Sequence, residues 1–205
     1  MTLSYRIGHT LSSWLARCFY DFRVVNEAGL HFEGPALVCS NHASFFDPPF
    51  IGQAFEKPIH FFARKTLFNN PLMGATLRSW QSIPIDRDHP DTSSLKTVIR
   101  LLRGGGKVLM FPEGTRTEDG HLLPAEAGVG LFLAKARAPV LPLRLFGTFE
   151  AFPRHRILPR PSSVTLVVGE KYTPDLAARS HLSGRELYQS LADEVMQRIA
   201  ALQLP

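Results

Sequence analysis

Short apolar runs typical of β-strands alternate along this chain with segments of helical periodicity. The runs cover about residues 36–40, 58–62, 82–85, 107–111, 140–145 and 163–168. Helical patterns between and after them cover about 92–103, 126–137 and 184–202. In the last pattern, Ser183 and Glu186 have the spacing of a capping box. Because such alternation favours parallel strands covered by helices, the sequence predicts a single α/β domain with a largely parallel mixed sheet flanked by helices.

The first 22 residues have the pattern of an amphipathic helix that precedes this domain. Apolar residues from Leu3 to Phe22 form one stripe, with Arg6 and Arg17 opposite. A helix packed on the core has this pattern, and so has a helix lying in a membrane interface with Trp14 near the headgroups. We expect a membrane-associating helix over 1–22 and the α/β domain over 23–205. The longest apolar runs are too short for a membrane-spanning helix.

Composition limits the class of protein. With 44% hydrophobic and 20% charged residues, the chain has the balance of a globular protein. Cys18 and Cys39 lack the spacing of a metal or redox site, so we expect reduced thiols in a cytosolic setting and no metal. The net charge of +5 suits acidic partners such as anionic lipid or phosphorylated substrates. Nucleic acid is disfavoured because the charge is scattered and no recognition motif is present.

A histidine and an aspartate lie five positions apart in the heptapeptide NHASFFD, residues 41–47. The preceding strand places His42 at the carboxyl edge of the sheet, where ligands bind in open α/β sheets. Positions i and i+5 point about 140° apart in a straight helix. His42 and Asp47 therefore meet only across a turn, which Pro48 and Pro49 favour. A carboxylate bonded to one ring nitrogen leaves the other free to take a proton from an alcohol.

A carboxylate and a guanidinium follow another strand in FPEGTR, residues 111–116. Gly114 permits close backbone approach, Thr115 adds donors and Arg116 offers a fork to phosphate. A structural turn with a Glu113–Arg116 ion pair is the alternative. Arg87, after the run 82–85, is a second candidate phosphate ligand at the same edge, with a surface ion pair as its alternative.

No covalent nucleophile is apparent in the sequence. Ser44 lacks the Gly-x-Ser-x-Gly elbow of serine hydrolases, and neither cysteine has a histidine at a catalytic spacing. We therefore expect direct attack by a substrate hydroxyl rather than an acyl-enzyme.

Taken together, these motifs resemble the glycerolipid acyltransferase family, whose best-known members are the lysophosphatidic acid acyltransferases. Residues 41–47 are similar to the family's NHx4D block, and residues 111–116 match its FPEGTR block at every position. Residues 85–87 are similar to the block that ends in arginine, and residues 140–143 to an apolar block around a proline. The resemblance covers about residues 22–170.

The resemblance implies transfer of a fatty acyl group from acyl-CoA or acyl carrier protein to the hydroxyl of a lysophospholipid. The foremost acceptor is 1-acyl-sn-glycerol 3-phosphate, which would give phosphatidic acid without any cofactor beyond the acyl donor. The resemblance also implies that His42 is the general base and Asp47 its partner. The resemblance further implies that the acceptor's glycerol phosphate is bound or positioned by Arg87, Glu113, Gly114, Thr115 and Arg116.

One departure from the family bears on the acceptor. The family usually has lysine or arginine just before a glycine in the helix after FPEGTR, whereas here the segment 124–128 carries Glu126. Glycerol 3-phosphate, another lysolipid or an acylated amino-acid lipid therefore stays open as the acceptor. From a different class, a non-catalytic lipid-binding protein could use the same scaffold. We expect peripheral attachment at the cytoplasmic face of an anionic membrane.

Overall fold

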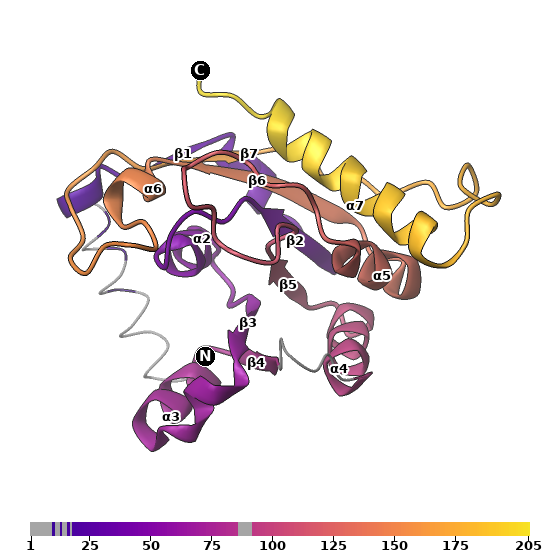
Figure 1. The fold of residues 1–205 in the computed structure, drawn as a ribbon, viewed down its shortest axis with the longest axis horizontal. Coiled ribbons are helices and arrows are strands. Elements are labelled where there is room, and N and C mark those ends of the chain that lie inside the picture. Colours follow the sequence, from indigo (N-terminus) through magenta and orange to yellow (C-terminus); the bar gives the residue numbers. More distant parts are fainter. Residues whose placement is uncertain (1–9, 11–12, 14–15, 17, 86–91) are drawn as a thin grey trace.

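The sheet of this protein has seven strands in the part of the chain that the structure describes, and their order is β1-β7-β6-β2-β5-β3-β4 (Figure 1). The structure is a computed structural model, and it describes residues 10, 13, 16, 18–20, 21–85 and 92–205. The strands are β1 (Arg23–Val25), β2 (Ala36–Ser40), β3 (His60–Arg64), β4 (Ser82–Ile85), β5 (Lys107–Met110), β6 (Val140–Phe146) and β7 (Thr165–Val168).

All neighbouring strands pair in parallel except β6 and β7, which are antiparallel. The predicted α/β domain with a largely parallel mixed sheet is therefore confirmed. All six predicted strands are present, with β2 and β4 at the predicted bounds. The sequence did not predict β1, whose three residues pair with β7 at the sheet margin. A strand this short carries too few residues to show an alternating pattern.

Helices connect the strands and cover the sheet. The α-helices are α2 (Asp47–Ala54), α3 (Pro71–Ser79), α4 (Thr92–Arg103), α5 (Ala127–Ala136), α6 (Thr148–Ala151) and α7 (Gly184–Ala201), with 3-10 helices η1 (Glu27–Leu30) and η2 (Lys65–Asn69). The patterns at 92–103, 126–137 and 184–202 match α4, α5 and α7 within one residue at each end. The prediction of a capping box was wrong. Ser183 is the N-cap of α7, but its side chain makes no cap hydrogen bond.

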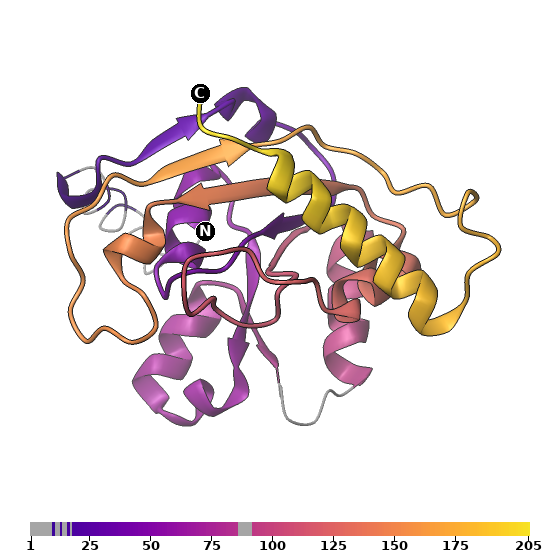
Figure 2. The same ribbon diagram turned by 45° about the horizontal axis from the view of Figure 1, so that its top comes forward.

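Two apolar clusters lie on opposite faces of the sheet, as the alternation along β2 shows. Leu37 and Cys39 face the cluster that α4, α5 and α7 complete, and Figure 2 shows α7 crossing that face. Ala36 and Val38 face the cluster that contains residues of α2 and of the chain before β2. Since every residue of β2 is buried, the central strand is covered on both sides.

The predicted membrane-associating helix over 1–22 lies mostly outside the described residues. Those that are described between Thr10 and Tyr20 are helical, and Ala16 is buried in the same cluster as α2. The backbone N–H of Val164 donates to the carbonyl of Tyr20 at 2.8 Å. Both cysteines are free thiols, Cys18 exposed and Cys39 buried. Within the described segments, no helix has the length and apolarity needed to cross a membrane.

Candidate active site

His42 and Asp47 meet at the carboxyl end of β2, as their spacing predicted. Nδ1 of His42 lies 2.8 Å from Oδ2 of Asp47, and Asp47 is fully buried. A carboxylate can only accept hydrogen bonds, so the imidazole proton that faces it belongs on Nδ1. Nε2 then carries the lone pair. No hydrogen bond to Nε2 is found among the described residues, and 11% of the side-chain surface of His42 remains exposed.

The turn that joins the two residues is held by the same carboxylate oxygen. The backbone N–H groups of Ala43 and Ser44 each donate to Oδ2 of Asp47 at 2.7 Å. Asp47 is the first residue of α2, and the prolines that follow it suit the first turn of a helix. The carboxylate therefore lies where the helix dipole favours negative charge. Backbone donors and the dipole fix Asp47 before any substrate arrives.

The aromatic ring of Phe111 restrains the other side of the imidazole. Its centroid lies 3.9 Å from that of His42, and the two planes differ by only 12°. Stacking on one face and the hydrogen bond to Asp47 at one edge leave the His42 ring little freedom to rotate. Phe111 is the first residue after β5, so the strand that neighbours β2 delivers it to this position.

Glu113 joins the FPEGTR segment to the backbone of His42. Its Oε1 accepts from the N–H of His42 at 2.9 Å, and its Oε2 accepts from the N–H of Leu123 at 3.1 Å. In the other direction, the N–H of Thr117 donates to the carbonyl of His42 at 2.9 Å. Burial raises the pKa of Glu113 to about 7, although the hydrogen bonds from the N–H groups of His42 and Leu123 act to lower it. Glu113 thus links the backbone of His42, the residue that carries the imidazole, to the backbone of Leu123.

Asn41 and Ser44 tie this loop to β6 and to the segment after it. The side-chain amide of Asn41 donates to the carbonyl of Leu145 at 2.9 Å and accepts from its N–H at 2.8 Å. The hydroxyl of Ser44 donates to the carbonyl of Phe152 at 2.7 Å. Sequence reasoning missed these positioning roles, and Glu113's as well. The only local signal was that each residue lies next to, or within, a motif.

Three of the remaining predicted substrate-binding residues follow Glu113 in the FPEGTR segment. Gly114 adopts φ +68°, which favours glycine, and it is exposed like Thr115, whereas Arg116 is half-buried. A Cβ built on Gly114 would lie 3.1 Å from Cγ of Glu126, so this acidic side chain lies against the loop. Arg87 lies outside the described residues. The phosphate-binding roles of these residues stay predictions.

Comparison with known proteins assigns the family. A family model described as Acyltransferase matches residues 21–145, a stretch that contains both motifs. The chain belongs to the acyltransferase family. Among the described residues of this acyltransferase, no group of three or more His, Cys, Asp or Glu side chains is placed to hold a metal ion.

The relatives of this acyltransferase include bacterial and plant proteins. It is 29% identical to the 1-acyl-sn-glycerol-3-phosphate acyltransferase of Bacillus subtilis over 88% of this chain and 87% of that protein. It is 32% identical to a chloroplastic 1-acyl-sn-glycerol-3-phosphate acyltransferase of Arabidopsis thaliana over 68% of this chain and 41% of the plant protein. The acyltransferase therefore spans less than half the length of that plant relative.

A solved structure resembles the whole fold. The 1-acyl-sn-glycerophosphate acyltransferase PlsC of Thermotoga maritima superposes with a TM-score of 0.74 at 26% sequence identity. The likeness covers 98% of this chain and 79% of the Thermotoga protein.

Proposed function

We propose that this protein transfers a fatty acyl group from an acyl thioester to the free hydroxyl of 1-acyl-sn-glycerol 3-phosphate, forming phosphatidic acid. The observation that carries the proposal is the buried pair of His42 and Asp47, 2.8 Å apart beside the FPEGTR segment. The names of the bacterial and plant relatives support the choice of acceptor. Acyl-CoA and acylated acyl carrier protein are both thioesters, and both suit the chemistry.

In the proposed mechanism, Nε2 of His42 removes the proton of the acceptor hydroxyl as its oxygen attacks the thioester carbonyl carbon. The carbon–sulfur bond then breaks, and the imidazolium returns the proton to the departing thiolate. Asp47 stabilises the imidazolium between these steps. Proton transfer of this kind contributes roughly 10²–10⁴ in rate. The products are an ester and a thiol, and no acyl-enzyme forms.

The acceptor's phosphate would lie against Gly114, Thr115 and Arg116, with Arg87 as a further ligand. A glycine at φ +68° and an arginine two residues later suit close approach of backbone and guanidinium to an anion. A lipid-binding protein without activity has no use for an oriented base, so the restrained imidazole of His42 favours catalysis over that alternative.

The deciding experiment measures free thiol released from palmitoyl-CoA by the purified protein, with and without lysophosphatidic acid in mixed micelles. We expect release that depends on the acceptor. Release without acceptor would instead indicate a thioesterase. If no thiol is released, palmitoyl acyl carrier protein is the next donor, and failure with both donors would refute the proposal.

Glu126 favours a second candidate, an acyltransferase for an acceptor with a less negative headgroup. Its side chain lies against Gly114, where a carboxylate repels a phosphate dianion. A panel of glycerol 3-phosphate, lysophosphatidic acid, neutral or zwitterionic lysolipids and acylated amino-acid lipids separates the candidates. A strong preference for lysophosphatidic acid, with a KM for it that is unchanged in Glu126→Gln, would exclude the second candidate.

We further propose that the protein works peripherally at the cytoplasmic face of a membrane, where its lipid acceptor resides. The net charge of +5 supports attachment to anionic lipid.

A further inference from the structure

Exposed apolar side chains gather at the edge of the sheet that carries His42. In the part of the chain that the structure describes, six large apolar residues are exposed in segments that follow the carboxyl ends of β2, β3 or β6: Phe45, Leu67, Leu72, Met73, Ile157 and Leu158. Because β2, β5, β3 and β6 all run in the same direction, these segments leave the sheet at one edge.

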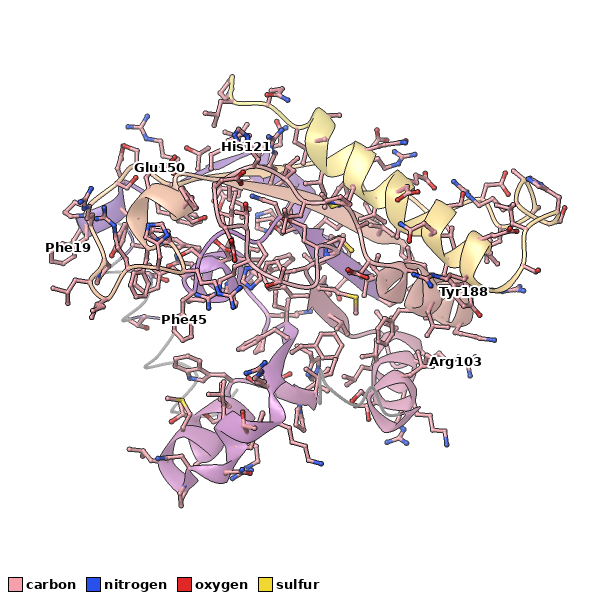
Figure 3. All side chains as sticks on the ribbon, viewed as in Figure 1. Phe19, Phe45, Arg103, His121, Glu150 and Tyr188 are labelled. Carbon is pink, nitrogen blue, oxygen red and sulfur yellow. The ribbon has the colours of Figure 1, made fainter. Side chains whose placement is uncertain are left out.

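The exposure of these side chains is unusually high. Ile157 is 91% exposed, Leu158 is 75% exposed and Leu72 is 80% exposed. In Figure 3, Phe45 lies between α3 and the loop that follows α6. Single exposed apolar residues are normal on a protein surface, but a group of them on one edge indicates a contact surface.

Two of these segments, η2–α3 and the loop 152–162, are also basic. Lys65 and Arg78 belong to η2 and α3, and residues 57–85 contain no aspartate or glutamate. The loop 152–162 carries Arg154, Arg156 and Arg160, also without an acidic residue. Exposed aliphatic side chains flanked by arginine and lysine are complementary to an anionic lipid interface, where the aliphatic groups insert and the cations meet phosphates.

The base of the loop is fixed to the candidate active site. The N–H of Arg160 donates to the carbonyl of Ala151 at 2.8 Å, which closes the loop and leaves Ile157 and Leu158 near its tip. Phe152 accepts the hydrogen bond from Ser44 and packs on Phe46 with ring centroids 4.9 Å apart. A lipid surface that holds the loop therefore lies on the same side of the molecule as the His42 segment.

We propose that η2–α3 and the loop 152–162, together with Phe45, form a docking surface for an anionic membrane, separate from the predicted N-terminal helix. The docking surface places the candidate active site at the interface in which an amphiphilic acceptor resides. This placement rests on the proposed function, whereas the docking itself requires no catalysis.

The test is co-sedimentation of the full-length protein with vesicles of phosphatidylcholine alone or mixed with phosphatidylglycerol. The variant is Ile157→Asp/Leu158→Asp, and the matched control is Leu204→Asp, which changes a leucine 51% exposed beyond the end of α7. We expect the partitioning of the variant onto the mixed vesicles to be weaker than that of the wild type by a factor of roughly five or more. The control should keep the wild-type value. Equal partitioning of wild type and variant would overturn the proposal.

A second pair of measurements tests the charge and the identity of the partner. Arg154→Gln/Arg160→Gln should weaken the dependence of binding on phosphatidylglycerol while both proteins melt at the same temperature. If the dependence on phosphatidylglycerol is unchanged, these arginines are not part of the docking surface. If the Ile157→Asp/Leu158→Asp variant loses binding to acyl carrier protein but keeps vesicle binding, the surface docks a protein and the lipid proposal fails.

Activity in two substrate forms separates docking from catalysis. With lysophosphatidic acid in detergent micelles, Ile157→Asp/Leu158→Asp should match the wild type, and with the acceptor in vesicles it should be slower. Vesicle binding through this surface by a protein without transferase activity would refute the proposed function alone. A loss of activity in both forms would contradict a role limited to docking.

Discussion

At the residue scale, the pair of His42 and Asp47 is the most direct target. In Asp47→Asn, the amide oxygen can still accept from the backbone of Ala43 and Ser44, but the charge that stabilises an imidazolium is lost. We expect the kcat of Asp47→Asn to fall roughly 10²–10⁴-fold with little change in KM. The kcat of His42→Ala should fall by a similar factor. Acceptor-dependent thiol release measures both variants.

Residues that act as one unit give non-additive losses, so the double variant should be little slower than either single one. Thermal melting is the control for folding. A folded His42→Ala protein with a near wild-type rate would remove the general base from the mechanism.

Glu113 makes stability depend on pH. Its pKa rises from 4.5 to about 7 because the carboxyl is buried, so the folded state binds the proton more tightly than the unfolded state. The free energy of unfolding should therefore fall as pH rises from about 4.5 through about 7. Glu113→Gln cannot titrate and should flatten this slope in urea unfolding measured across that range.

Glu118, an exposed glutamate of the same loop, gives the matched control for this experiment. Glu118→Gln should keep the wild-type slope. A slope unchanged in Glu113→Gln would show that other groups cause the pH dependence.

At the scale of elements, the close packing of α5 on α7 depends on one glycine. A Cβ built on Gly130 would overlap the backbone carbonyl of Tyr188 in α7, whereas a Cβ on Gly128, also in α5, would meet nothing within 4 Å. Gly130→Ala should lower the free energy of unfolding by about 1–3 kcal/mol or more, because the two helices must separate. Gly128→Ala should raise it by up to about 1 kcal/mol. Denaturant unfolding compares them, and equal effects would contradict the close contact.

At the scale of the whole molecule, the role of the N-terminal segment in membrane binding can be tested only with a deletion that leaves the core intact. Ala16 is buried in the core, and Tyr20 and Phe22 pack on Phe50, so a deletion through residue 22 would remove part of the core. Deletion of residues 2–9 spares these contacts and removes Leu3 and Ile7 of the apolar stripe. We expect weaker binding to anionic vesicles with the melting temperature nearly unchanged. Undiminished binding would exclude this part of the segment as an anchor.

The sequence by itself determined features that short stretches of chain encode. Hydrophobic periodicity gave the α/β class and the bounds of β2, β4 and α4. The proline-rich turn and the five-residue spacing predicted the meeting of His42 and Asp47, because both groups lie on one short segment. Hydrophobic periodicity did not predict α3, because its apolar residues Leu72 and Met73 are exposed and form no stripe toward the core.

Only the tertiary structure decided contacts between distant segments. Glu113 reaches the backbone of His42 across 71 positions, and Asn41 reaches Leu145 across 104. These contacts require β2 to lie between β5 and β6. Strand order depends on which apolar faces and chain connections pack best over the whole domain, and no local pattern of residues specifies it. The family resemblance named Glu113, but its hydrogen bonds appear only when the strands are in place.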